Sequence, residues 1–282
     1  MCGPTPNSFC WIRVTDRASS PEYLPIISAR RGSSGAIPYM TGTQFVGQAT
    51  AGVLIVCARC WLMSTPCVWT ISEVSGPLGH VPARAPTAQS GQWVPGPGAE
   101  FFSAVQKELG GLPFIAEDLG LITPDVSTLR DQFHLPGTRV LQFAFDGPSD
   151  DPHLPKNYTS NTVVYTGTHD NPTTREWYEE LPDAQRQTVW RYMKRREGRG
   201  SEAAPALIEL AWSSGAALAI APLQDVLNLG AEARMNTPGR AEDNWRWRCP
   251  EDILSAPEME WLQDLTMTWN RSGILRRLQA AQ

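Results

Sequence analysis

A pair of adjacent carboxylates, Glu117 and Asp118, is the feature of this sequence best suited to acid–base chemistry. The pair follows the short apolar run Phe114–Ala116 and is closed by Gly120. A run of this length between turn signals is typical of a strand that is buried on both faces, as in a parallel sheet. Carboxylates at the C-terminal tip of such a strand lie where α/β barrels and open α/β sheets keep their catalytic groups. The same pattern also fits acids that cap the next helix or face solvent.

A second segment also consists of an apolar run followed by polar residues. The apolar run that begins at Val163 continues to Thr168 and ends in the polar cluster His169, Asp170 and Asn171. The structural alternatives are an ordinary N-cap of the following helix for Asp170 and a satisfied buried histidine for His169.

Strand and helix patterns alternate around these two clusters. We expect strands at 114–116, 139–145, 163–168 and 216–222, and helices near 101–109, 124–133, 172–181, 183–197, 202–214 and 257–280. Thr123 and Pro124 supply an N-cap and a first-turn proline to the second of these helices. Such alternation predicts an α/β fold with a parallel sheet or barrel. Four βα units are visible, half of those in a (β/α)8 barrel.

Composition and charge argue against several classes of protein. A formal charge of −5 offers no basic surface to nucleic acid. The stretch Phe45–Met63, in which Arg59 alone is ionised, is long enough for a membrane span, but glycines and polar residues dilute it and no basic flank orients it. Cys57 and Cys60 have zinc-ribbon spacing, yet no second pair completes a metal site. The N-terminus has no signal-peptide pattern, and we expect a cytoplasmic protein with no membrane partner.

Several motifs in one order resemble the 4-α-glucanotransferases, also called amylomaltases or disproportionating enzymes (glycoside hydrolase family seventy-seven). They are A-E-D-L-G at 116–120, P-G-T-R-V-L-Q-F-A-F-D at 136–146, G-T-H-D-N at 167–171, P-L-Q-D-V-L at 222–227 and A-R-M-N-T-P-G-R at 233–240. The resemblance extends from about Val81 to the C-terminus. It implies a TIM barrel with insertions, transfer of α-1,4-glucan segments between maltooligosaccharides with retention of configuration, and no metal or organic cofactor.

The resemblance also assigns roles to individual residues. It implies that Glu117 is the general acid/base and that Asp170 stabilises the transition state. His169, Asn171 and Asn236 would bind the sugar substrate, although a turn residue is the default for an asparagine like Asn236. Cleavage of a glycosidic bond explains the need for an acidic residue, because a glycosidic oxygen leaves poorly unless a carboxylic acid protonates it. A retaining enzyme also needs a carboxylate nucleophile on the opposite face of the sugar, roughly 5 Å from the acid.

That nucleophile is missing from the sequence. In the family it is the Asp of an R-x-D-H-F-R-G motif on the fourth strand, and the corresponding residues 67–74 read C-V-W-T-I-S-E-V. Read one base out of step, codons for this stretch can spell R-L-D-H-F-R-G, and the junction of Trp69 and Thr70 forces Asp. Codons for 25–42 can similarly spell D-Y-F-S-A-T-G-Q-L-W-G-N-P-L-Y-D-W. Residues 1–80 also hold no lysine, the first being Lys107, and five of the six cysteines.

We therefore predict that residues 1–79 are an out-of-frame, non-native segment. Residues 80–282 would form βα units five to eight, the C-terminal half of a glucanotransferase barrel. The predicted function is a 4-α-glucanotransferase that is inactive as written, and the alternative is a non-catalytic remnant that at most binds glucans. A hydrolytic α-amylase relative shares the His-Asp pair but fits A-E-D-L-G less well, and a dehydrogenase lacks support because no G-x-G-x-x-G follows a strand.

Overall fold

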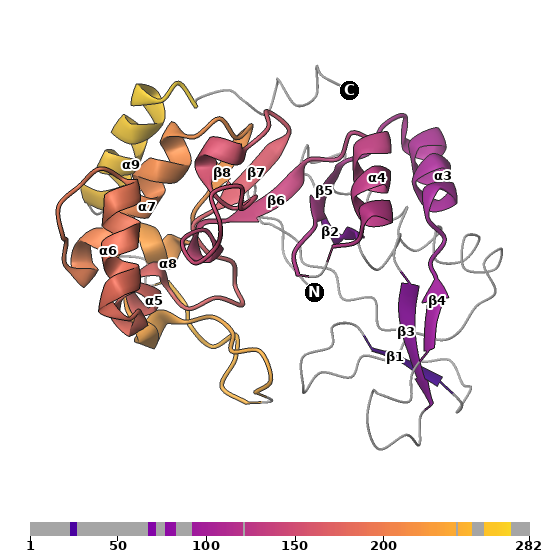
Figure 1. Cartoon of the computed structure of the whole chain (residues 1–282), viewed down its shortest axis with the longest axis horizontal. Helices are drawn as coiled ribbons and strands as arrows, with labels where there is room; N and C mark the ends of the chain where they lie inside the picture. The colour runs from indigo at the N-terminus through magenta and orange to yellow at the C-terminus, as the bar shows by residue number, and fades with distance from the viewer. Residues whose placement is uncertain are drawn as a thin grey trace. The chain divides into compact units, whose positions relative to one another are not determined.

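The computed structural model describes residues 23–26, 67–71, 77–82, 92–120, 122–240, 242–249 and 257–271. The chain divides into two compact units, Met1–Gly137 and Thr138–Gln282, whose α-helices and strands are labelled in Figure 1. The predictions made for Cys57, Cys60 and the stretch Phe45–Met63 lie outside the described residues. No helix in the described ranges is both long enough and apolar enough to cross a membrane.

The described strands of the first unit form an antiparallel sheet and a parallel set. Strands β1 (Tyr23–Ile26), β3 (Pro77–Pro82) and β4 (Gln92–Pro95) form an antiparallel sheet in the order β1-β3-β4. Strand β2 (Cys67–Thr70) pairs in parallel with β5 (Phe114–Glu117), and β5 pairs in parallel with the start of β6 (Gly137–Val140), where Ala116 is opposite Gly137. Helix α3 (Ala99–Leu109) precedes β5, and helix α4 (Pro124–Gln132) follows it.

Apolar periodicity explains why these elements form where they do. Helix α3 buries Phe101, Phe102 and Val105 along one stripe, and Gly110 ends it in the left-handed conformation with φ of 73°. The rings of Phe101 and Phe102 meet Phe114 of β5 at centroid distances of 6.5 and 6.0 Å. This cluster of apolar side chains anchors β5 and thereby sets the position of its C-terminal tip.

The second unit places helices around the parallel pair β7 and β8. Its elements are η2 (Leu141–Phe143), η3 (Pro155–Asn157), β7 (Thr162–Tyr165), α5 (Thr174–Glu180), α6 (Asp183–Tyr192), α7 (Gly200–Ser213), β8 (Leu218–Ile220), α8 (Leu223–Val226), η4 (Ala231–Ala233) and α9 (Pro257–Thr268). Val163 is opposite Leu218, and Tyr165 is opposite Ile220. Helix α7 packs against α5, α8, α9 and β8 (Figure 1).

The predicted α/β class with a parallel sheet is confirmed, but three strands and one helix were predicted too long. The strands expected at 163–168 and 216–222 are found as β7, which ends at Tyr165, and β8, which ends at Ile220, and the helix expected at 183–197 ends at Tyr192. The expected strand at 139–145 ends at Val140 as β6, and the chain then turns through the 3-10 helix η2. The Ala144 N–H closes this turn on the Leu141 carbonyl at 3.0 Å. Gln142 is buried there and donates from Nε2 to the Pro172 carbonyl at 3.1 Å, a contact with a distant loop that local sequence does not reveal.

Candidate active site

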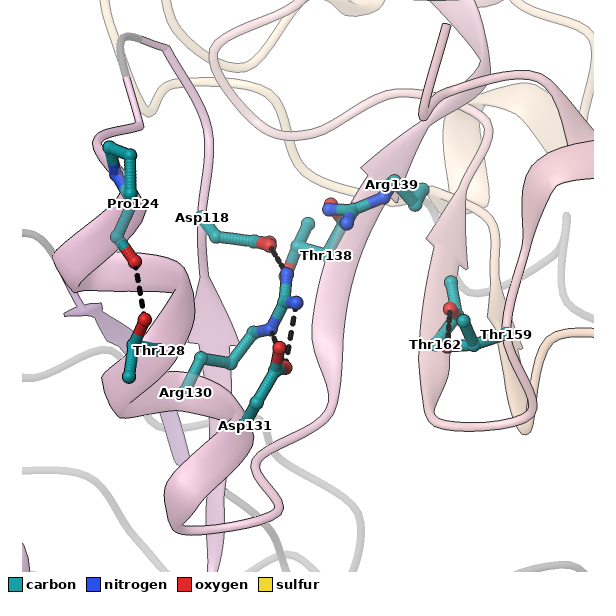
Figure 2. Close-up of polar contacts among 9 residues, drawn as sticks. All are labelled: Asp118, Pro124, Thr128, Arg130, Asp131, Thr138, Arg139, Thr159 and Thr162. Carbon is teal, nitrogen blue, oxygen red and sulfur yellow. Dashed lines mark hydrogen bonds and ion pairs between the residues drawn. The ribbon is translucent and has the colours of Figure 1, made fainter. Parts of the chain in front are cut away.

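The two adjacent carboxylates at the end of β5 have different surroundings. Asp118 is buried, and its Oδ2 accepts a hydrogen bond of 2.6 Å from Arg130 Nη1 of helix α4. Figure 2 shows this guanidinium between Asp118 and Asp131, and its Nε and Nη2 donate to Asp131 at 2.9 and 2.7 Å. Burial alone would lower the pKa of Arg130, but the hydrogen bonds to Asp131 and Asp118 outweigh it and raise that pKa. Asp118 is thus tied into the structure, whereas Glu117 is partly exposed at the strand tip.

Gly137, at the start of β6, leaves room for this ion pair. A Cβ atom at that position would lie 3.0 Å from Asp118 Oδ2 and 3.4 Å from Arg130 Nη1. Because real Cβ atoms seldom approach other atoms so closely, a larger residue would push against the pair. The need for space beside the Asp118–Arg130 ion pair therefore explains why position 137, in the P-G-T-R motif, is a glycine.

The predicted site residues 169–171 lie in a loop, residues 167–173, between β7 and α5. One buried carboxylate, Asp225 of α8, holds both ends of this loop. Its Oδ2 accepts hydrogen bonds from the hydroxyls of Thr166 and Thr174 at 2.6 and 2.7 Å, and its Oδ1 accepts one from the Thr174 N–H at 2.7 Å. Burial raises the pKa of the Asp225 carboxyl, and these hydrogen bonds oppose part of the effect.

The helix that follows the loop has its own cap. Thr173 and Glu176 form a capping box, in which Thr173 Oγ1 accepts from the Glu176 N–H at 3.2 Å and Glu176 Oε2 accepts from the Thr173 N–H at 3.3 Å. The N-cap of α5 is therefore Thr173. This excludes the alternative in which Asp170 caps the helix.

Within the loop, Asp170 and Asn171 face different partners. Asn171 Oδ1 accepts hydrogen bonds from the backbone N–H and the hydroxyl of Thr168 at 3.0 and 2.8 Å, so this side chain braces the loop. Asp170 has a half-exposed side chain, and its Oδ1 lies 3.2 Å from His169 Nε2. The role of Asn171 in substrate binding stays a prediction.

Burial favours the neutral form of the histidine. Burial lowers the pKa of His169 from its ordinary value of 6.5, and the negative charge of Asp170 opposes only part of this. A neutral imidazole donates from one ring nitrogen, so Nε2–H can donate to the Asp170 carboxylate. In that form the imidazole carries no positive charge to pair with the Asp170 carboxylate.

A distant segment completes this cluster. Asn236 Nδ2 donates to Asp170 Oδ1 at 2.5 Å, although the two residues are 66 positions apart. Arg234 braces the arrangement, since its Nη2 donates to the Asp170 carbonyl at 3.3 Å, its Nε donates to the Asn236 carbonyl at 3.1 Å, and its Nη1 lies 3.4 Å from Glu176 Oε1. We refer to His169, Asp170 and Asn236 as the polar cluster.

The structure places the predicted site residues in two groups. Glu117 lies in the first unit, whereas the polar cluster and Asn171 lie in the second. The polar cluster presents a carboxylate, an amide and an imidazole, a set of acceptors and donors suited to the hydroxyl groups of a sugar. Within the described ranges, no group of three or more His, Cys, Asp or Glu residues is placed to hold a metal ion.

Sequence reasoning missed three residues of this region. Asp225 and Arg234 lie inside the motifs P-L-Q-D-V-L and A-R-M-N-T-P-G-R, so a signal was present, but nothing local shows that they reach the loop at 167–173. Trp245 was missed as well, and its ring lies 5.1 Å from that of His169 between centroids.

Comparison with known proteins decides the family. The sequence model described as 4-alpha-glucanotransferase matches residues 59–254. The chain belongs to the 4-α-glucanotransferase family. It is 51% identical over 184 residues to the 4-alpha-glucanotransferase of Synechocystis sp., covering 64% of this chain and 35% of that protein. It is 50% identical over 181 residues to that of Thermus thermophilus, covering 62% of this chain and 36% of that protein.

A solved structure agrees with this membership. The amylomaltase from Streptococcus agalactiae in complex with acarbose superposes with a TM-score of 0.78 at 25% identity, covering 89% of this glucanotransferase-family chain and 51% of that one. The chain spans about a third of the length of the curated relatives it matches. All motifs that carry the resemblance, from A-E-D-L-G to A-R-M-N-T-P-G-R, lie inside the matched residues 59–254.

Proposed function

We propose that this chain is the C-terminal half, βα units five to eight, of a retaining 4-α-glucanotransferase barrel that acts on α-1,4-glucans. The observation that carries the proposal is the hydrogen bond of 2.5 Å from Asn236 Nδ2 to Asp170 Oδ1, which joins two family motifs in one polar cluster. Acarbose, the ligand named for the amylomaltase neighbour, is an oligosaccharide, which supports a glucan as the ligand.

In this proposal Asp170 acts on the transition state. The side chain is half exposed and the amide of Asn236 orients its carboxylate, which leaves acceptor capacity for sugar hydroxyls. Hydrogen bonds that shorten as the sugar ring flattens lower the barrier rather than the ground state. His169 lies beside it, with Nε2 at 3.2 Å from Asp170 Oδ1, and burial lowers its pKa and so favours the form without positive charge.

Glu117 is the proposed general acid/base. The neighbouring Asp118 accepts a hydrogen bond from Arg130 and has a structural role. Glu117 is the acid of A-E-D-L-G that lies at the strand tip. A carboxylic acid that protonates the glycosidic oxygen and later activates the acceptor hydroxyl is what a retaining transfer requires.

The position of the missing nucleophile is consistent with the frame-slip hypothesis. Strand β2 runs parallel to β5, with Trp69 opposite Ala116 and Thr70 opposite Glu117. The junction that the shifted frame reads as Asp, Trp69–Thr70, thus lies at the C-terminal end of the strand beside the proposed acid. The backbones of neighbouring strands are about 4.8 Å apart, so carboxylates at two adjacent strand tips can reach the roughly 5 Å separation of a retaining pair.

Two experiments test this proposal. The nucleotide sequence across residues 69–74 should read Asp-His-Phe-Arg-Gly one base out of step; any other codons there refute the frame-slip hypothesis. Incubation with maltotriose should yield no glucose and no longer chains from the chain as written, whereas the frame-corrected gene product should yield both. Transfer activity of the chain with the given sequence would show that glucan transfer does not require the missing nucleophile.

Controls make the second experiment specific. In the frame-corrected protein, Glu117→Gln should abolish transfer, because an amide cannot protonate the glycosidic oxygen. Glu180→Gln, a change on the exposed surface of α5, should leave transfer unchanged. Equal activity of the Glu117→Gln variant and its parent would refute the assigned role.

A further inference from the structure

An exposed indole lies beside the polar cluster. In the described part of the chain, four large apolar side chains are exposed: Phe143, Trp245, Met267 and Trp269. Of these, Trp245 is the one that contacts the cluster, since its ring lies 5.1 Å from the His169 ring with an angle of 34° between their planes. It nevertheless keeps 45% of its surface exposed. A large aromatic side chain left open next to polar groups is typical of a ligand-binding surface.

The backbone holds this indole in place at a conformational cost. Trp245 has φ of 63°, a left-handed conformation that bulky residues rarely adopt. Two hydrogen bonds keep it there, because its N–H donates to the Met235 carbonyl at 2.7 Å and its carbonyl accepts from Arg248 Nη1 at 2.8 Å. Strained residues that their surroundings over-determine in this way are concentrated at functional sites.

The turn before Trp245 is braced as well. Asn244 Oδ1 accepts from the Thr237 N–H at 2.9 Å, and Asn244 Nδ2 donates to the Arg240 carbonyl at 2.9 Å. These bonds tie the indole to the same segment that carries Asn236. The apolar ring and the polar amide are therefore presented together.

A glucosyl unit has the complementary surfaces. Its ring carries C–H bonds on two broad faces and hydroxyl groups around its rim. The face of an indole is apolar and carries negative quadrupole charge, which attracts C–H groups. An aromatic surface beside a carboxylate and an amide thus matches one sugar ring, with the face on Trp245 and rim hydroxyls on Asp170 and Asn236.

We propose that Trp245 is a stacking platform for one glucosyl unit of the bound glucan, adjoining Asp170. The inference rests on the proposed function, because it takes the ligand to be an α-1,4-glucan. Its rival is a purely structural role, in which the indole only shields His169 from water.

The test is calorimetric titration of the whole chain with maltotriose. Trp245→Ala should weaken binding by about tenfold, equivalent to ~1.4 kcal/mol. Trp245→Phe, which keeps an aromatic face, should bind within about threefold of the parent. The matched control is Trp269→Ala, which removes a tryptophan of similar exposure, 43% against 45%, at the end of α9. This control should bind like the parent.

The outcomes separate the two proposals. If the parent binds maltotriose and Trp245→Ala binds equally well, the stacking role is refuted while the proposed function stands. If the parent itself does not bind, the proposed function fails and the stacking role with it. If Trp245→Ala does not fold, 19F spectra of the parent labelled with 5-fluorotryptophan provide the test. The Trp245 resonance is assigned from its loss in Trp245→Phe. Maltotriose should shift this resonance and leave that of Trp269 in place. An unmoved Trp245 resonance would refute stacking.

Discussion

Replacement of Asp225 by alanine is the perturbation that tests how the loop at 167–173 is held. The Asp225 carboxylate is 1% exposed and accepts three hydrogen bonds, two of them from Thr174 and one from Thr166. The donors come from both ends of the loop. Loss of the carboxylate should therefore release the loop and destabilise the second unit.

The magnitude follows from the three donors. In Asp225→Ala the buried N–H of Thr174 loses its acceptor, which costs about 1–3 kcal/mol. The two threonine hydroxyls can rotate, and each loses about 1 kcal/mol. The variant no longer has to keep a charge out of water, which offsets part of this loss. We expect a net loss of about 2–4 kcal/mol in the free energy of unfolding.

Asp225→Asn removes the negative charge of the side chain and keeps its size, so it measures the effect of the charge on stability. Its carbonyl can still accept from the Thr174 N–H, and its amide can donate to the hydroxyl oxygens of Thr166 and Thr174, so we expect a loss of only about 1 kcal/mol at acidic pH. The pKa of Asp225 is raised by burial in the folded state. The contribution of Asp225 to the free energy of unfolding is therefore complete below the unfolded pKa of about 3.9. It declines as the pH rises through the folded pKa. The asparagine variant should become more stable relative to the parent across that window.

Urea unfolding followed by circular dichroism at pH 4 and pH 7 measures both effects. For Asp225→Ala the midpoint should fall by roughly 1 M or more at pH 7. Thr174→Ser, which keeps the hydroxyl and the N–H and loses one buried methyl group, is the matched control and should cost only about 1 kcal/mol. Equal midpoints for the parent and Asp225→Ala would refute the idea that this carboxylate holds the loop. A difference between the parent and Asp225→Asn that does not vary with pH would refute the charge argument.

Three further outcomes follow from the described contacts. Asp170→Asn should lower the pKa of His169 further, because the carboxylate opposes the effect of burial, and an NMR titration of the imidazole that shows no downward shift would contradict this. Asp118→Asn removes the negative partner of a partly buried guanidinium (Figure 2) and should cost about 1–3 kcal/mol in urea unfolding, a result that an unchanged midpoint would exclude. Gly137→Ala should cost about 1–3 kcal/mol because its Cβ would lie 3.0 Å from the Asp118 carboxylate, whereas Gly215→Ala, with no atom within 4 Å, should not; equal effects would contradict the steric reason.

Local periodicity predicted most of the elements because the apolar stripes are long or sharply bounded. The strand at 114–116 was found as β5, and the stripe from Phe101 to Leu109 was found as α3. The strand expected at 139–145 was cut short because Gln142 bonds to the carbonyl of Pro172, 30 positions away. A residue that satisfies its side chain across such a distance leaves no trace in the local pattern.

The sequence by itself determined the family, the α/β class and the identities of the acidic residues at the two strand tips. Motifs of several residues in a fixed order carry that information without any knowledge of contacts. Only the tertiary structure decided how these residues are used: Asp118 pairs with Arg130, Asn236 reaches Asp170, and Asp225 holds the loop between β7 and α5. The physical reason is that a carboxylate looks the same in a sequence whether it is buried or open. Its role depends on the donors that folding brings to it from distant parts of the chain.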